Sequence, residues 1–336
     1  MLKPYLVDVP VRVNIWIRPE CQRKQFEVLK QARPSIIFLQ SDGGRNEKEW
    51  EAIRKNRKIF EEEVDWDCTI HKLYEEENQG LYTMGKKVSK YIWEHVDRCI
   101  FLEDDFIPAV SFFQYCAELL EKYKDDTRIS CICGMNHLGV YEDASSDYFF
   151  SRQGSIWGVA NWRRSHELRN PDHPFANDPY TMKLLNQRTR KNPTFRRVIK
   201  GYAKGKYFEG HVAGAEFFVE FSMYGHNQLQ IIPKKNMICN IGCTENGTHA
   251  TTWKQTPKGL RKLFNMKTYE MEFPMKHPEY VIPDTFYEKK RNRTIAYNYP
   301  LVKFYRRIES ALLAIKSGSF FKRLKKKISK LGAIEK

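Results

Sequence analysis

Residues 99–105 read Cys-Ile-Phe-Leu-Glu-Asp-Asp, four apolar residues followed without a break by three acids. Apolar residues then recur every three or four positions from 112 to 120, which predicts a helix. A strand that leads into a helix is the repeating step of a parallel α/β sheet. The three acids therefore fall at the carboxyl end of a strand, where ligands collect in such sheets.

Three similar steps lie upstream. Apolar residues alternate with polar ones from Val11 to Ile17, and Pro19 then begins a helical pattern. Residues 35–39 precede a helix capped by Asn46, and residues 68–73 precede a helix over 84–92. We therefore expect an α/β fold with an open, mainly parallel, twisted sheet that carries helices on both faces.

The second half of the chain is less regular. Residues 129–133 and 231–232 are predicted strands, whereas 138–147 and 171–193 are predicted long loops that shape an acceptor site.

We divide the chain at about residue 295. Residues 1–295 form one core domain, with a donor half over about 10–135 and an acceptor half over about 136–285. Residues 296–336 form a basic, amphipathic helical appendage. With 336 residues, of which 41% are apolar, the chain buries a substantial core.

Targeting and cysteine signals are weak. The first ten residues contain no basic stretch leading into an apolar run, and no segment reaches the roughly 20 apolar residues that cross a bilayer. The eight cysteines are scattered and lack the paired spacing of structural zinc sites, so reduced thiols are expected. These features predict a cytoplasmic protein.

Charge is concentrated at the C-terminus. The net charge is +16, and residues 301–336 hold eleven Lys or Arg residues against two Glu, a local balance of +9. Gly318 separates two amphipathic patterns, and the second has the composition of an interfacial helix. We therefore expect a peripheral protein on an anionic membrane, the inner face of the plasma membrane. The alternative is that these helices pack on the core.

Three adjacent acids repel one another and need a cation nearby. Mg²⁺ or Mn²⁺ meets that need, because such ions bind one or two carboxylates together with phosphate oxygens. A solvated acidic turn is the alternative. Asp42 ends another strand and precedes two glycines, so it can meet a base or ribose, or it can form an ordinary Asp-Gly turn. Arg18 is expected beside it as a partner for phosphate or base.

Longer segments around these residues resemble a known family. Val13–Pro19, Ser35–Gly44 and Cys99–Tyr115 are similar to the GT-A fold glycosyltransferases related to N-acetylglucosaminyltransferase I. They are closer still to its bacterial relatives in surface-polysaccharide synthesis. The similarity spans most of residues 11 to about 283, through the segments Ile132–Asn136, Ile156–Trp162, Pro233–Gly242 and Thr248–His249.

The resemblance implies a nucleoside diphosphate-sugar donor held with Mn²⁺ or Mg²⁺. Asp105 matches the metal-binding member of the triplet, and His249 matches a late residue near the metal or diphosphate. A core or surface histidine is the alternative for His249. For the donor, Asp42 matches the acid that contacts the base, and Arg18 lies where the first strand meets the nucleotide.

The rest of the triplet completes the implied donor site. Asp104 faces the donor sugar or ribose, and Glu103 belongs to the same donor-binding group. On the acceptor side, Trp157 and Gly158 match a strand-turn where an aromatic face stacks on a sugar ring. Core packing is the alternative for Trp157.

The implied inverting mechanism needs a carboxylate that takes the proton from the acceptor hydroxyl. The family pattern at this position is Trp-Asp, whereas this chain has Ala-Glu216-Phe. Glu216 is therefore the predicted base, with a longer side chain and without the tryptophan. Glu220 is the competitor, and a buried structural glutamate is the alternative for either.

The sequence thus predicts an inverting glycosyltransferase that acts on a saccharide or lipid-linked acceptor in bacterial polysaccharide or glycan synthesis. A sugar-phosphate nucleotidyltransferase would need a glycine-rich loop after the first strand, and residues 18–21 contain no glycine. A non-catalytic binder of membrane or nucleic acid is the third class. The chain has no zinc-finger or RNA-recognition motif, so no nucleic-acid partner is expected.

Overall fold

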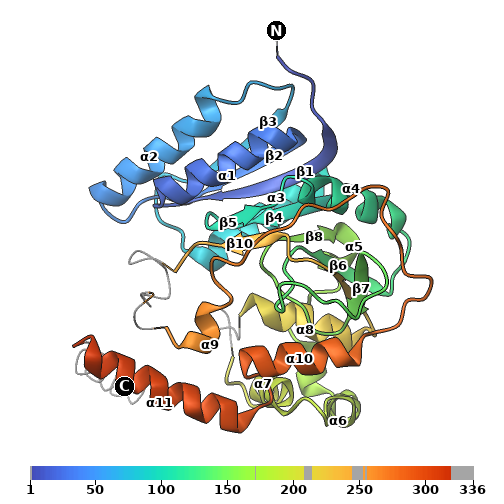
Figure 1. The fold of residues 1–336 in the computed structure, drawn as a ribbon. Coiled ribbons are helices and arrows are strands. Elements are labelled where there is room, and N and C mark those ends of the chain that lie inside the picture. Colours follow the sequence, from blue (N-terminus) through green and yellow to red (C-terminus); the bar gives the residue numbers. More distant parts are fainter. Residues whose placement is uncertain (1, 171, 208–213, 244–252, 254–255, 319–336) are drawn as a thin grey trace.

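The computed structural model describes residues 2–170, 172–207, 214–243, 253 and 256–318. Within these ranges an eight-stranded mixed sheet forms the centre of the molecule, in the order β3-β2-β1-β4-β8-β6-β9-β7 (Figure 1). The strands are β1 Val7–Ile15, β2 Pro34–Ser41, β3 Thr69–Tyr74, β4 Arg98–Leu102, β6 Ile129–Cys133, β7 Tyr148–Ser151, β8 Val159–Trp162 and β9 Leu229–Pro233. β5, Phe106–Pro108, pairs with β10, Ile238–Asn240, in a separate antiparallel ribbon.

The first four sheet strands are parallel and follow the predicted strand-to-helix order. The helices between and after them are α1 Pro19–Ala32, α2 Glu47–Glu62, α3 Leu81–His95 and α4 Phe112–Lys122. Asn46 caps α2 by accepting from Glu49 N at 3.1 Å, as its position predicted.

Helices cover both faces of this parallel half. Ile37 and Leu39 pack in the cluster that holds the apolar residues of α1, α2 and α4. Phe38, which points to the opposite face, packs instead on α3. The predicted α/β architecture is therefore confirmed, and the buried alternation along β1 is its clearest element.

The second half of the sheet mixes directions. β8 runs antiparallel to β4 and β6, β9 is parallel to β6, and β7 is antiparallel to β9. The predicted strands at 129–133 and 231–232 are present, whereas β7 and β8 were not predicted. α8, Ala215–Gly225, and α10, Thr285–Ile295, contribute Val219, Met223 and Tyr287 to the cluster on this part of the sheet.

The prediction of a long loop over 171–193 is wrong. The described part of this region forms a 3-10 helix, η1 Pro174–Asn177, and α6 Pro179–Arg188, and α7 Pro193–Ala203 follows. Asp178 caps α6 by accepting from Tyr180 N at 3.0 Å, and Pro residues occupy the first turns. The prolines and acids that suggested a loop are therefore helix-start signals. Residues 138–147 lie outside all named helices and strands, as predicted.

The last helix of the described residues is long. Two short helices, α5 Arg163–Glu167 and α9 Lys258–Arg261, precede the appendage, and α11 spans Pro300–Lys316. The second predicted amphipathic helix lies outside the described residues. In the described part of the chain, no helix combines the length and hydropathy needed to span a bilayer.

Candidate functional site

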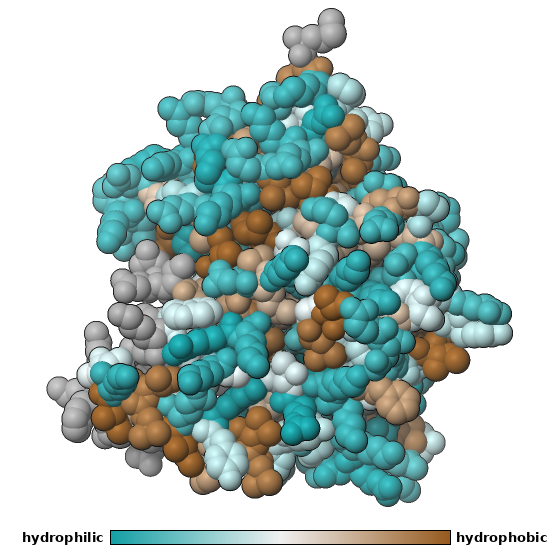
Figure 2. Space-filling view, in the orientation of Figure 1, coloured by the Kyte–Doolittle hydropathy of each residue, from teal (hydrophilic) through white to brown (hydrophobic). Residues whose placement is uncertain are grey.

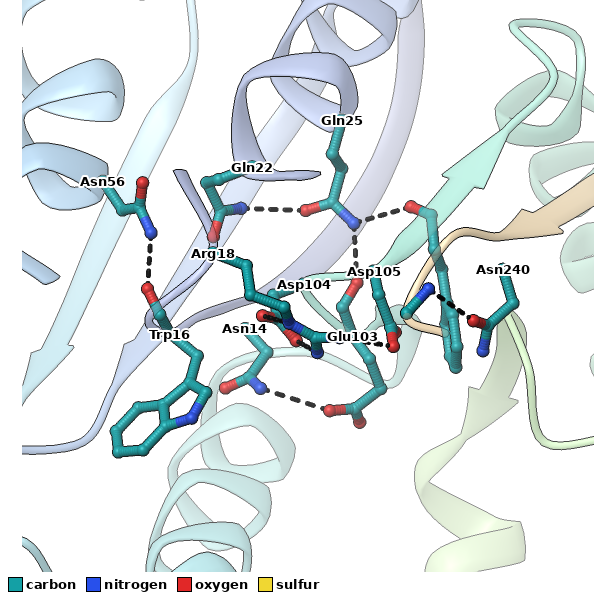
Figure 3. A network of polar contacts seen from close by, with 12 residues as sticks. Asn14, Trp16, Arg18, Gln22, Gln25, Asn56, Glu103, Asp104, Asp105 and Asn240 are labelled. Carbon is teal, nitrogen blue, oxygen red and sulfur yellow. Dashed lines mark hydrogen bonds and ion pairs between the residues drawn. The ribbon is translucent and has the colours of Figure 1, made fainter. Parts of the chain in front are cut away.

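The three predicted acids form the turn between β4 and β5. Phe106 N donates to Glu103 O at 3.1 Å, and the buried Gln25 side chain of α1 donates to the carbonyls of both residues at 2.7 and 2.8 Å. This amide therefore fixes the turn from the side of the first helix (Figure 3).

Arg18 lies between two of the three acids. It is the residue before α1, and its Nε donates to Asp104 Oδ2 at 2.8 Å while Nη2 donates to Asp104 Oδ1. Nη1 donates to Asp105 Oδ2 at 3.0 Å. The exposed fractions are 9% for the Arg18 side chain and 4% for Asp104. One buried guanidinium therefore holds both carboxylates, which Figure 3 shows from close by.

The third acid has partners from β1. Arg12 Nη2 donates to Glu103 Oε1 at 3.0 Å, and Asn14 Nδ2 donates to Oε2 at 3.2 Å. The Glu103 side chain is more exposed than the other two acids, at 40%. Arg12 and Asn14 are the polar members of the β1 alternation, so the face that carries them was predictable, although their partner was not.

The charges of the triplet are only partly offset. Arg12 and Arg18 supply two positive charges against three carboxylates. Burial raises the pKa of Asp104 to about 6 and also raises the pKa of Asp105, while Arg18 opposes both shifts. The turn therefore favours a further cation.

A distant segment completes this site. β10 pairs with β5 so that Asn240 lies opposite Phe106, and Ile241 N then donates to Asp105 O at 3.0 Å. Gly242 follows, and a Cβ at that position would lie 1.8 Å from Asp105 Oδ2 and 2.8 Å from Arg18 Nη1. Only a glycine allows this segment to approach the acids so closely.

Asp42 follows β2, and its carboxylate connects the loop after β2 to the loop before α3. Its Oδ1 accepts from Gly43 N at 2.9 Å and from Gln79 N at 2.8 Å. Its Oδ2 accepts from Gly80 N at 2.9 Å and from Asn78 Nδ2 at 3.2 Å. The carboxylate therefore orders the loop before α3, next to the edge of the sheet where the acids lie.

Trp157 and Gly158 lie before β8. The Trp157 ring packs against Phe106 and Phe264, with ring centroids 6.0 and 5.4 Å apart. Gly158 has a φ of +62°, and a Cβ there would lie 2.4 Å from Ile238 Cδ1. Both residues therefore contact the β5–β10 ribbon beside the acidic turn.

The two candidate bases differ in their surroundings. Glu216 lies in the first turn of α8 with an exposed side chain. Glu220 accepts from Tyr297 Oη at 2.7 Å on both oxygens, and Asn192 Nδ2 donates to Oε1 at 2.7 Å. Burial raises the pKa of Glu220. Glu220 therefore joins α8 to α7 and to the segment after α10, which is a structural role.

The donor set at the turn fits a hard divalent ion. Arg18 uses both oxygens of Asp104 but contacts Asp105 through Oδ2 alone. Among the described residues no three His, Cys, Asp or Glu side chains converge into a complete metal site. Mg²⁺ and Mn²⁺ bind through one or two carboxylates with phosphate and water. Asp105 satisfies that mode, and His249 lies outside the described residues.

A cavity in the second half of the chain is lined by residues other than these acids. A cavity of about 940 Å³ opens between α8 and the η1–α6 region, lined among others by His173, Phe218 and Arg188. None of the predicted site residues lines it.

Comparisons with known proteins concern the fold. No protein-family model matches the sequence, and a comparison with curated proteins gives no match. Similar solved structures include a mannosyltransferase from Pyrobaculum calidifontis in complex with GDP-Man and Mn²⁺, with 13% identity and a TM-score of 0.31. That match covers 49% of this chain and 47% of the mannosyltransferase. A UDP-glucose pyrophosphorylase complexed with UDP-glucose has 7% identity and a TM-score of 0.32, covering 69% of this chain and 92% of that one.

A putative nucleotide-diphospho-sugar transferase from Desulfovibrio desulfuricans G20 has 12% identity and a TM-score of 0.27, covering 52% of this chain and 69% of that one. The chain thus spans about half the length of the mannosyltransferase. At such identities and TM-scores the likeness assigns no activity, ligand or residue role to this chain.

Proposed function

We propose that this protein is an inverting glycosyltransferase that moves a sugar from a nucleoside diphosphate-sugar to a hydroxyl of a saccharide or lipid-linked acceptor. The observation that supports it is the acidic turn after β4, in which Arg12 and Arg18 supply two positive charges against three carboxylates. A site with one carboxylate in excess at the carboxyl end of a parallel strand suits a cation and a diphosphate.

On the donor side, Asp105 holds the divalent ion, with His249 as a further candidate ligand. A bound Mg²⁺ or Mn²⁺ supplies positive charge against the negative charge that develops on the leaving diphosphate. Arg18 orients Asp105 and Asp104. In the proposed complex Asp104 lies on the side of the sugar or ribose. Asp42 and Glu103 complete the nucleotide side, at the ends of β2 and β4.

On the acceptor side, Glu216 takes the proton from the attacking hydroxyl. Glu216 is exposed at the start of α8, so an acceptor can reach it from solvent, whereas Glu220 is held by Tyr297 and Asn192. Trp157, which packs on Phe106 beside the acidic turn, and Gly158 are the proposed acceptor surface on the side of that turn.

A nucleotide-sugar screen tests this function. Purified protein is incubated with each donor and either Mn²⁺ or a chelator, and nucleoside diphosphate release and thermal stabilisation are measured. We expect release with one donor, loss on chelation, and loss in the Asp105→Asn variant that still folds. No release and no stabilisation with any donor would refute the proposal. Nucleoside triphosphate formed on adding pyrophosphate would identify a nucleotidyltransferase instead.

A further inference from the structure

One face of α11 is apolar and exposed. Large apolar side chains recur every three or four residues, which places them on one side of the helix. Their exposed fractions run from 43% to 72%, and they are Leu301, Phe304, Tyr305, Ile308, Leu312 and Ile315. Figure 2 shows hydrophobic residues gathered at the lower left, where α11 lies in Figure 1. We call these six side chains the α11 stripe.

The opposite side of α11 packs on the protein. Arg306 Nη2 donates to Thr294 O at 2.5 Å, Glu309 Oε1 accepts from Lys258 N at 2.9 Å, and Ala314 is buried. The helix therefore uses polar contacts to attach to the body and directs its apolar side outward. This orientation is the reverse of a helix that packs its apolar side on its own core.

The charges beside the stripe are positive. Lys303, Arg307 and Lys316 of α11 are exposed, while the acid Glu309 is already engaged. By sequence, residues 319–336 add seven Lys or Arg against one Glu. Two copies of such a surface repel each other, whereas anionic headgroups attract it, and Lys and Arg stems reach past apolar groups to the headgroup level.

We infer that the α11 stripe is a docking surface for an anionic lipid bilayer. The helix lies parallel to the membrane, with its apolar side chains among the acyl chains and its basic side chains at the headgroups. The stripe combines six exposed apolar side chains with exposed basic residues on the same helix, and a contiguous apolar patch of this kind marks an interaction surface.

Contacts link this surface to the acidic turn. Gly242 lies against Asp105, and the next residue, Cys243, has its Sγ 3.6 Å from Thr256 Oγ1. Thr256 precedes α9, and Lys258 at the start of α9 donates to Glu309 of α11. The donor site and the docking helix are therefore joined through one short helix. If the proposed function holds, on which this step rests, the acceptor is carried by a membrane lipid.

Vesicle sedimentation of the full chain tests the surface. The vesicles are phosphatidylcholine with or without phosphatidylglycerol. The variant Ile308→Gln with Leu312→Gln removes two exposed apolar side chains one turn apart without changing charge. The control, Tyr180→Gln with Leu184→Gln, also replaces two exposed large side chains by Gln at the same spacing, but on α6, where they are 68% and 46% exposed.

We expect the wild type and the control to bind anionic vesicles, and the α11 variant to bind at least roughly tenfold more weakly. Added salt weakens wild-type binding because it screens the basic side chains. Equal binding by the two variants, or no wild-type binding, overturns the inference. A third outcome also overturns the inference: the wild type is a dimer that does not bind vesicles, and the α11 variant is a monomer. In that case a second copy of the chain covers the stripe.

The readouts keep the two proposals separate. Vesicle binding requires no turnover, and donor hydrolysis is measured without vesicles. An α11 variant that keeps donor hydrolysis but loses transfer to a vesicle-borne acceptor supports both proposals. Intact vesicle binding with no hydrolysis of any donor refutes the transferase alone.

Discussion

The Arg18 guanidinium donates two hydrogen bonds to the Asp104 carboxylate, from Nε to Oδ2 at 2.8 Å and from Nη2 to Oδ1. Both side chains are almost completely buried, so each supplies the charge that the other needs to remain in the interior. Arg18 therefore partly neutralises the acids after β4 without a bound metal or donor.

Arg18→Ala is expected to destabilise the fold by about 3 kcal/mol, because it leaves Asp104 buried without its partner. Guanidinium chloride unfolding measures the loss. Arg23→Ala is the matched control, since Arg23, in the first turns of α1, forms a similar two-nitrogen contact with Glu63 at the surface. We expect a much smaller loss there. Equal losses in the two variants would contradict the importance of burial.

Asp105→Asn is expected to lower turnover by roughly a hundredfold or more, because it weakens the carboxylate proposed to hold the metal. The wild type should gain thermal stability from Mn²⁺ with a nucleoside diphosphate, and the variant should not. Asp143→Asn serves as the control, because Asp143 pairs with Lys290 on the surface. The same metal response in wild type and Asp105→Asn would remove Asp105 from the metal site.

Gly242→Ala is expected to lower turnover and to cost about 1–3 kcal/mol of stability. The new Cβ would lie 1.8 Å from Asp105 Oδ2, so either the acid or the 241–243 segment must move. Gly85→Ala in α3 is the control, because no atom lies within 4 Å of its added Cβ. That change should stabilise the helix by up to about 1 kcal/mol. Unchanged kinetics in Gly242→Ala would show that the close approach is not needed.

Glu216→Gln should reduce kcat by roughly 10²-fold or more while leaving unfolding within about 0.5 kcal/mol of wild type. Glu216 is exposed, so its carboxylate is dispensable for folding. Glu220→Ala should instead lower the melting temperature, because it leaves the Tyr297 hydroxyl and the Asn192 amide without their acceptor. Full activity in Glu216→Gln would remove it as the base.

The stability effect of Glu220 should depend on pH. Burial raises its pKa in the folded state, so the protonated form is favoured there. Its contribution to stability is present below the unfolded pKa and is lost as the pH rises through the folded pKa. The difference in melting temperature between wild type and Glu220→Ala should therefore shrink as the pH rises above about 4, which is near the unfolded pKa. A difference that grows with pH would contradict this sign.

Local patterns were enough to predict the parallel half of the sheet. The alternation along β1, the cap at Asn46 and the apolar run before Glu103 each depend on residues a few positions apart. The backbone geometry of a strand or helix sets the spacing of its apolar residues within one segment, so that spacing can be recognised in the sequence. The same reasoning failed over 171–193, because Pro and Asp begin helices as well as loops.

The sequence by itself determined the α/β class, the acids at the end of β4 and the amphipathic character of the C-terminal region. Only the tertiary structure decided that Arg18 pairs with Asp104, that Gly242 lies against Asp105, and that the apolar side of α11 faces outward. The first two relationships join residues that are far apart in the sequence, and the third depends on which side of α11 packs on the rest of the protein. No periodic pattern in the sequence predicts such relationships. They depend on strand register and on how separate elements pack, which the folded chain settles as a whole.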